Sequence, residues 1–291
     1  MWIYLNDGFV QKADARISVF DHGFLYGDGI YETLRTYRGR LFMLQPHLAR
    51  LKRSARLIGL ELPVADKDWP ALLEDTLSRN GLGPSGNADA HLRITVSRGE
   101  GELGLDPALC KRPTVVIMAK PLTIYPARLF AEGVSLAIVP IRRNLDAALS
   151  PQIKSLNFLN NILAKQQATQ AGAFDALMLN AGGQVAECTT SNIFFVRDGR
   201  LCTPAVECGI LDGITRDVVL RLAREQSIPT EEGRYGADSL WQAQEGFITN
   251  TSMEIMPVCR IDGRPVGDGR PGPVTTKLRQ LFQANVGRFL A

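Results

Sequence analysis

Cysteine and histidine are scarce in this chain of 291 residues, which holds five cysteines and three histidines. The cysteines form no CxxC pair and no even-numbered framework, so we expect no disulfide scaffold, and a reducing compartment fits best. Because cysteine and histidine do not cluster, the sequence gives no reason to expect a metal site.

Long apolar runs and an excess of either charge are also missing. No run approaches the roughly 20 apolar residues that a membrane span needs, and residues 1–8 lack the charged and apolar regions of a signal peptide. The 33 basic and 30 acidic residues leave a net charge of +3 without any basic run, which argues against a nucleic-acid partner. We expect a globular, cytoplasmic protein that is long enough for two domains.

Lysine is the scarcer basic residue, with eight lysines among the 33 basic residues when they are counted along the sequence. One of them, Lys154, lies in the segment 151–161 between an extended apolar approach and the start of a helix. Arginine cannot form an imine, so a lysine at such a junction indicates covalent catalysis. Taken alone, the lysine is better explained as a solvated residue near a helix N-terminus.

Periodicity and turn residues predict strands and helices throughout the chain. Pro121 and Pro126 frame the best domain boundary, which gives an N-terminal domain over 1–120, a linker over 121–127 and a C-terminal domain over 128–291. An Asn-Asp-Gly turn predicts an N-terminal hairpin, and three glycines between positions 21 and 29 predict a loop. The other main elements are helices at 46–59, 69–80, 157–171, 238–243 and 273–287, a helix opening at 214, a hairpin over 176–187, and strands at 30–37, 90–98, 113–120, 191–196 and 247–252.

Polar side chains gather at several predicted element ends. Alternation along 30–37 places Tyr31, Thr33 and Arg35 on one strand face, which is either exposed or the floor of a polar pocket. Glu187 ends a strand, where a solvated hairpin edge is the simpler explanation. Arg50 lies beside the apolar stripe of its helix. Its side chain either reaches towards solvent or binds a phosphate through two N–H groups of its guanidinium.

A helix start supplies a further group of this kind. Gly213 precedes the helix that opens at Ile214 and Thr215, whose free backbone N–H groups form a natural phosphate cradle or an ordinary capped helix. A lysine, a carboxylate, a helix start, hydroxyls and an arginine are together what pyridoxal phosphate chemistry needs. The lysine forms the imine, the carboxylate pairs with the pyridine nitrogen, and the remaining groups hold the phosphate.

The order of these motifs resembles the class IV (fold type IV) pyridoxal-phosphate aminotransferases over essentially the whole chain. That family includes branched-chain and D-amino acid aminotransferases, aminodeoxychorismate lyases and some R-amine transaminases. The resemblance implies a small N-terminal and a larger C-terminal α/β domain with pyridoxal 5′-phosphate between them, and a homodimer or dimer-based oligomer with shared active sites. The motifs are Phe20-Asp-His-Gly-Phe-Leu-Tyr-Gly-Asp-Gly29, Lys154-Ser-Leu-Asn, Val185-Ala-Glu187 followed by Ser191-Asn192-Ile-Phe-Phe, Leu211-Asp-Gly-Ile-Thr-Arg-Asp217 and Thr249-Asn-Thr251-Ser-Met-Glu-Ile-Met-Pro257.

The resemblance assigns roles to individual residues. Lys154 looks like the Schiff-base lysine and proton shuttle, and Glu187 looks like the partner of the pyridine nitrogen. Leu211 matches the leucine that packs on the ring face. The expected phosphate site consists of Arg50, Gly213, Ile214, Thr215 and Thr251.

The expected substrates are an amino acid and a 2-oxo acid, with branched-chain L-amino acids and 2-oxoglutarate as the leading pair. Arg93, Arg35 and the loop 99–107 are most similar to branched-chain enzymes of the archaeal type, although Thr33 and Phe158 stand where those enzymes have glycine and tyrosine. Thr33 and the stretch 249–253 are also similar to aminodeoxychorismate lyase, which eliminates pyruvate. A D-amino acid aminotransferase is a further alternative, although this chain lacks the usual Arg-x-His trap. The expected substrate-binding residues are Tyr31, Thr33, Arg35, Arg93, Thr251 and Ser252.

Overall fold

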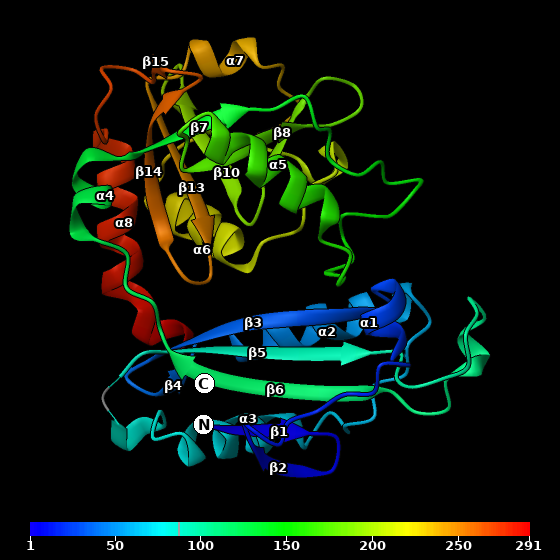
Figure 1. Ribbon diagram of the computed structural model, residues 1–291. Coiled ribbons are helices and arrows are strands. Elements are labelled where there is room, and N and C mark those ends of the chain that lie inside the picture. The colour runs from blue at the N-terminus through cyan, green and yellow to red at the C-terminus, as the bar shows by residue number, and fades with distance from the viewer. Residues whose placement is uncertain (87) are drawn as a thin grey trace. The chain divides into compact units, whose positions relative to one another are not determined.

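The computed structural model describes residues 1–86 and 88–291, which divide into two compact units (Figure 1). The first unit consists of Met1–Thr123, Ile153–Asn157 and Val286–Ala291, and the second of Ile124–Gln152 and Phe158–Asn285. The chain first leaves the first unit within the predicted linker. It then returns twice, so that Lys154 and the last six residues belong to the first unit.

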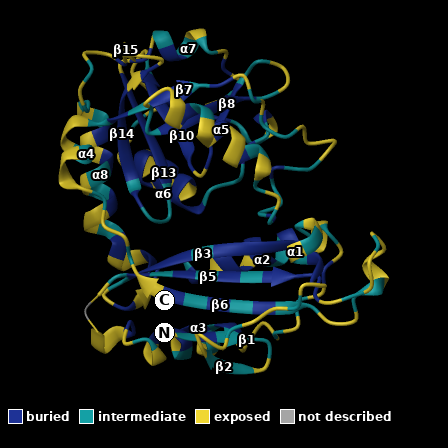
Figure 2. Ribbon diagram, in the orientation of Figure 1, coloured by how far each residue is buried: buried dark blue, intermediate teal, exposed yellow. Residues whose placement is uncertain are grey.

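The first unit is a six-stranded antiparallel sheet with helices packed on it. The strand order is β2-β1-β6-β5-β3-β4, and α2 and α3 bury their apolar faces on β3 and β6 (Figure 2). This packing removes leucine side chains of the helices and branched side chains of the strands from water, which is the main stabilising contribution. Its elements are β1 (Trp2–Leu5), β2 (Gly8–Gln11), α1 (His22–Tyr26), β3 (Gly29–Tyr37), β4 (Arg40–Leu41), α2 (Leu44–Leu57), α3 (Trp69–Arg79), β5 (Ala90–Ser97), β6 (Thr114–Pro121) and the 3₁₀ turns Pro84–Gly86, Pro107–Leu109 and Val286–Phe289.

The second unit is built on a nine-stranded mixed sheet. Its order is β12-β11-β10-β13-β14-β7-β8-β9, with β15 paired to β14, and the pairs β11–β12, β14–β7 and β7–β8 are parallel. Both units are therefore mixed α/β, which confirms the predicted fold class. The elements are α4 (Ala127–Glu132), β7 (Val134–Ile138), α5 (Leu159–Gln170), β8 (Asp175–Leu179), β9 (Val185–Cys188), β10 (Asn192–Arg197), β11 (Arg200–Pro204), a 3₁₀ turn (Val206–Cys208), α6 (Ile214–Glu225), β12 (Thr230–Gly233), α7 (Asp238–Trp241), β13 (Glu245–Asn250), β14 (Glu254–Ile261), β15 (Arg264–Pro265) and α8 (Pro273–Asn285).

The glycine-rich segment 21–29 differs from the predicted loop because it contains the short helix α1. Asp21 caps this helix by accepting a hydrogen bond from the Gly23 N–H at 2.8 Å, and Gly27 ends it with φ 71°. Gly23 lies inside the helix, and a larger residue would not fit there, because its Cβ would lie 2.5 Å from the Cβ of Ser97. Close approach to β5, as well as turn formation, therefore explains the glycines of this segment.

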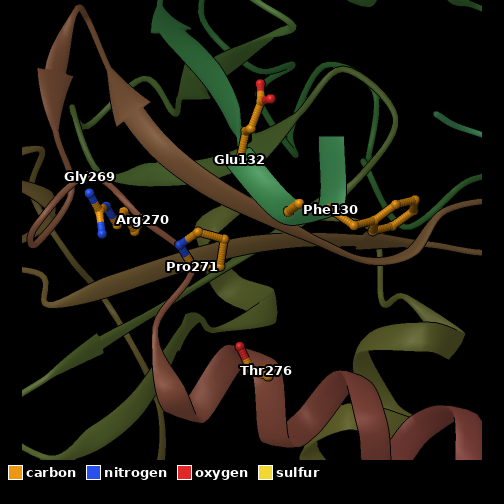
Figure 3. A pocket seen from close by; sticks show the side chains of 7 residues that line it. Phe130, Glu132, Gly269, Arg270, Pro271 and Thr276 are labelled. Atoms are coloured by element: carbon orange, nitrogen blue, oxygen red, sulfur yellow. The ribbon is translucent and has the colours of Figure 1, made fainter. Parts of the chain in front are cut away.

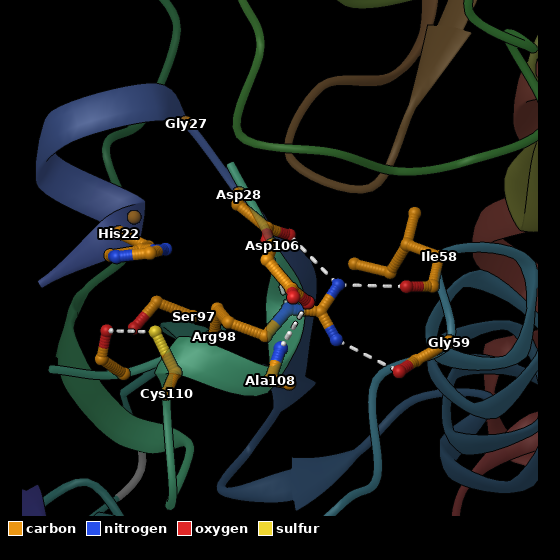
Figure 4. A network of polar contacts seen from close by, with 12 residues as sticks. His22, Gly27, Asp28, Ile58, Gly59, Ser97, Arg98, Asp106, Ala108 and Cys110 are labelled. Atoms are coloured by element: carbon orange, nitrogen blue, oxygen red, sulfur yellow. Dashed lines mark hydrogen bonds and ion pairs between the residues drawn. The ribbon is translucent and has the colours of Figure 1, made fainter. Parts of the chain in front are cut away.

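Arg98 fastens the C-terminal end of α2 to the strands of the first unit (Figure 4). Its Nε and Nη2 donate to the Asp28 carboxylate at 2.8 and 3.1 Å. Nη1 donates to the Gly59 carbonyl at 2.8 Å, and Nη2 to the Ile58 carbonyl at 2.7 Å. Carbonyls at a helix end have no partner within the helix, so this buried guanidinium satisfies two acceptors that would otherwise be costly to bury.

No helix within residues 1–86 and 88–291 is long and apolar enough to cross a membrane.

We predict that Arg98→Ala destabilises the protein by about 2 kcal/mol, because Asp28 and two carbonyls lose their donors together. Chemical unfolding followed by circular dichroism measures the loss. Arg112→Ala is the matched control, since its ion pair with Asp7 is exposed to solvent and its loss should cost little stability. Equal stability of the two variants would contradict the role given to Arg98.

Candidate active site

Lys154 is held by its backbone and its side chain within the first unit. Its N–H donates to Ser54 Oγ at 3.1 Å, and its carbonyl accepts from the Tyr31 N–H at 2.9 Å. Its Nζ donates to the Tyr31 hydroxyl at 3.2 Å and lies 4.4 Å from the centroid of that ring. The side chain is half-buried and fixed, so the alternative of a freely solvated lysine does not describe it.

Tyr31 also contacts Arg93, so that the Arg93 guanidinium and the Lys154 amine both lie against the Tyr31 side chain. The Arg93 guanidinium carbon lies 3.9 Å from the centroid of the Tyr31 ring, and Arg93 Nε donates to Thr95 Oγ1 at 3.1 Å. Burial lowers the pKa of Arg93, while the contact with Tyr31 opposes that shift. The structure therefore brings together Lys154, Tyr31 and Arg93, three of the residues selected from the sequence.

The polar face of β3 is not an exposed sheet face, because Tyr31 and Arg35 are each only 6% exposed. Arg35 Nη2 forms an ion pair with Asp89 Oδ2 at 2.8 Å, and its guanidinium lies 3.9 Å from the Tyr37 ring centroid. Thr33 is half-buried and pairs with Arg93 in the β3–β5 register. The substrate roles of Thr33 and Arg35 stay predictions.

Arg50 is buried and bound to a carboxylate that the sequence analysis did not single out. Its Nε and Nη2 donate to Oε1 and Oε2 of Glu32 at 2.7 and 3.0 Å, and His47 Nδ1 lies 2.8 Å from Oε2. Burial alone would raise the pKa of Glu32, but Arg50 and His47 outweigh it and hold that pKa well below its usual range. Arg50 therefore does not reach towards solvent, and its role at a phosphate stays a prediction.

Glu187 is the corresponding buried carboxylate of the second unit. Its Oε1 accepts from Arg143 Nε at 2.8 Å, and its Oε2 accepts from Asn192 Nδ2 at 3.1 Å and from the Leu211 N–H at 3.0 Å. A solvated hairpin edge is thus the wrong description of this residue. Arg143 was missed, since it stands in no pattern that marks it before the fold is known. Asn192 stands in a motif of the family resemblance but was given no role.

The start of α6 leaves backbone donors without a side-chain cap. Gly213 is the N-cap residue and, having no side chain, caps none of the N–H groups of the first turn that Ile214 and Thr215 open. A Cβ on Gly213 would overlap Asn192 Oδ1, so a larger residue would displace the side chain that donates to Glu187. A helix start with free N–H groups favours an anion.

Thr251 and Ser252 lie in the tight turn between β13 and β14, just beyond Asn250, where β13 ends. Asn250 Oδ1 accepts from the N–H groups of Ser252 and Met253, both at 2.9 Å, and this fixes the turn. Thr249 Oγ1, on β13 beside Asn192, is buried without a hydrogen-bond partner within residues 1–86 and 88–291. These contacts give the turn a defined shape, while the roles of Thr251 and Ser252 stay predictions.

The predicted site residues form one set in each unit. The first unit carries Tyr31, Thr33, Arg35, Arg50, Arg93 and Lys154, and the second carries Glu187, Leu211, Gly213, Ile214, Thr215, Thr251 and Ser252.

The second unit also has a surface hollow (Figure 3). Phe130 and Glu132 of α4, Arg270 and Thr276 are among its lining residues, and none of the predicted site residues lines it. The side chains of its one acid and one base are separate in the close-up, so it offers no group of converging polar atoms of the kind found at Lys154 or Glu187.

Comparison with known proteins identifies the class to which this fold and these residues belong. The family described as amino-transferase class IV matches residues 29–261, and the chain belongs to that family. It is a pyridoxal-phosphate-dependent transaminase, as the motifs predicted.

Relatives within the family have several activities. The chain is 44% identical over 283 residues to a Methanocaldococcus jannaschii protein with the provisional name of branched-chain-amino-acid aminotransferase, covering 97% of this chain and 96% of that one. It is 37% identical to a D-alanine aminotransferase of Listeria monocytogenes, covering 97% and 95%. It is 32% identical to an aminodeoxychorismate lyase of Bacillus subtilis, covering 99% and 96%.

Solved structures confirm the fold. The branched-chain aminotransferase of the archaeon Thermoproteus uzoniensis with norvaline superposes with a TM-score of 0.91 at 33% identity, covering all of this chain and 98% of that one.

We predict that Gly213→Ala disrupts the start of α6 and costs about 2 kcal/mol of stability, because the new methyl group collides with the Asn192 side chain. The free energy of unfolding measures this effect. Gly236→Ala in the same unit is the control, since a Cβ there meets nothing within 4 Å. A Gly213→Ala variant as stable as the control would show that the close contact is not required.

Proposed function

We propose that this transaminase exchanges an amino group between branched-chain L-amino acids and a 2-oxo acid such as 2-oxoglutarate, with Lys154 as its covalent cofactor site. The observation that carries the proposal is the cluster of Lys154, Tyr31 and Arg93, in which the lysine amine lies against a phenol that also contacts a cation. The names of the M. jannaschii relative and of the T. uzoniensis structure support the choice of substrate.

The residues of the chain fit pyridoxal phosphate. Glu187 presents a buried carboxylate oriented by three donors, which suits a protonated ring nitrogen. The uncapped N–H groups at Ile214 and Thr215 suit a phosphate. Pyridoxal phosphate, when bound, supplies an electron-accepting ring that stabilises negative charge at the α-carbon of the amino acid.

Lys154 and its neighbours would then handle the proton and the substrate carboxylate. With the cofactor bound, Nζ would carry the proton that leaves the α-carbon of the amino acid, while the Tyr31 hydroxyl, 3.2 Å from Nζ, would keep the amine in place. The Arg93 guanidinium attracts a carboxylate, and the half-buried setting strengthens that attraction. The phosphate roles of Arg50 and Thr251, and the packing of Leu211 on the ring, are part of the same proposal.

A second candidate, aminodeoxychorismate lyase, is favoured by Thr33 and by the Thr-Asn-Thr-Ser-Met stretch at 249–253. It would use the same lysine and carboxylate but would release pyruvate. The higher identity to the M. jannaschii relative than to the B. subtilis lyase ranks it second.

We predict that L-leucine discharges the yellow absorbance of the purified enzyme as pyridoxamine phosphate forms, and that 2-oxoglutarate restores it. Stepwise addition of L-leucine, D-alanine and L-glutamate, followed by visible absorption, measures this. Discharge by D-alanine but not by L-leucine would contradict the branched-chain assignment. Discharge by none of the donors, together with pyruvate release from aminodeoxychorismate, would establish the lyase.

We also propose that the enzyme is a cytoplasmic homodimer, and that its two subunits contact each other through α1 and the loop 99–106. Phe24, Leu103 and Leu105 are 66%, 67% and 83% exposed. The two segments are neighbours, because the Gly101 N–H donates to the Phe20 carbonyl at 3.3 Å and the Gly104 N–H to the Tyr26 hydroxyl at 3.3 Å. Grouped exposed apolar side chains mark protein–protein contacts. A second copy of the chain is the partner that we propose, because the family resemblance implies a homodimer.

We predict a solution mass of twice 31.9 kDa by light scattering, and a shift towards the monomer in Leu103→Lys. A lysine there buries a charge in the contact, which weakens association. Leu57→Lys, at the end of α2, replaces an exposed leucine outside the two segments and is the control. A monomeric wild type, or a Leu103→Lys variant that dimerises as well as the control, would refute this contact.

A further inference from the structure

We propose that Ser54 is a positioning residue for Lys154. This inference rests on the proposed function, in which Lys154 binds the cofactor covalently. The Ser54 hydroxyl is fully buried and accepts a hydrogen bond from the Lys154 N–H at 3.1 Å.

The segment around Lys154 runs along β3, and Ser54 is its contact with a helix. The Lys154 carbonyl accepts from the Tyr31 N–H, and the Leu156 N–H donates to the Gly29 carbonyl, both at 2.9 Å. Ser155 forms an antiparallel bridge with Ile30. The strand therefore fixes one edge of the segment, and Ser54 fixes the N–H of the lysine itself.

Helix α2 can serve as a rigid support because polar contacts hold it on both sides of Ser54. Arg50 and His47, one and two turns earlier on the same face, both contact the buried Glu32 carboxylate. Beyond its C-terminal end, Arg98 binds the carbonyls of Ile58 and Gly59 (Figure 4). These contacts fix the register of α2 against β3, and with it the place of the Ser54 hydroxyl.

Fixing the backbone of a lysine restricts where its amine can lie. From this backbone position the Nζ lies 3.2 Å from the Tyr31 hydroxyl. Without the hydrogen bond from its N–H to Ser54, Lys154 samples more positions. Its amine then spends less time where a bound aldehyde can react. Loss of Ser54 should weaken the covalent step and spare non-covalent binding.

The test compares two ligands of the full-length chain after removal of its cofactor. Pyridoxal 5′-phosphate carries an aldehyde, whose carbon joins Lys154 Nζ as a C=N bond with loss of one water. Pyridoxine 5′-phosphate carries an alcohol instead and binds without that bond. For Ser54→Ala we expect the Kd of the aldehyde to rise about fivefold, the effect of one ordinary hydrogen bond, and the Kd of the alcohol to stay unchanged.

Thr76→Val is the matched control, since Thr76 is a fully buried residue on α3 of the same unit whose hydroxyl donates within its own helix to the Leu72 carbonyl. It should change neither Kd. The proposal is overturned if Ser54→Ala binds the aldehyde as the wild type does, if it weakens both ligands equally, or if Thr76→Val shows the same selective loss. If Ser54→Ala does not fold, Ser54→Cys, which keeps the volume and weakens the acceptor, is measured under the same criteria.

Failure of the proposed function looks different. A wild-type chain that binds both ligands with equal affinity and forms no C=N bond would refute covalent binding before any variant is made, and this inference would fall with it.

Discussion

The buried carboxylate of Glu32 is the contact on which the arrangement of the first unit depends. It lies on the apolar face of β3 and accepts from Arg50, with His47 beside it, so that two positions of α2 are tied to one strand. A buried ion pair adds little net stability compared with apolar packing, yet it is strongly directional. The helix thus gains a defined register, and Ser54 and the Lys154 backbone follow from it.

The second unit also holds a buried carboxylate, Glu187, among several hydrogen-bond donors. Arg143, Asn192 and the Leu211 N–H each supply one donor to this carboxylate, and Gly213 makes room for Asn192. In both units a charge is buried where several donors surround it. Catalytic groups need this kind of orientation more than they need added stability.

The sequence predicted the longer helices, the N-terminal hairpin and the lysine because each depends on local chemistry. An Asn-Asp-Gly turn, an apolar stripe or a lysine before a helix is visible within about ten residues. The partners of the predicted residues were harder to find. Arg143 lies 44 positions from Glu187 and Asp89 lies 54 from Arg35, and no local pattern connects residues so far apart.

One missed residue did leave a signal. Alternation along 30–37 placed Glu32 with Ile30 and Leu34 on the face opposite Tyr31, and an acid among core residues requires a buried basic partner. Helix α1 was missed for a different reason, since glycines that serve close packing resemble glycines that serve a turn.

The central claim is that Lys154 is the residue that binds pyridoxal phosphate. The most direct measurement treats the enzyme and pyridoxal phosphate with borohydride, digests the protein and locates the added mass by peptide mass spectrometry. We predict a single modified peptide that contains Lys154, and no modification at that site without the cofactor. Modification of a different lysine, or of none of the lysines in the chain, would contradict the account.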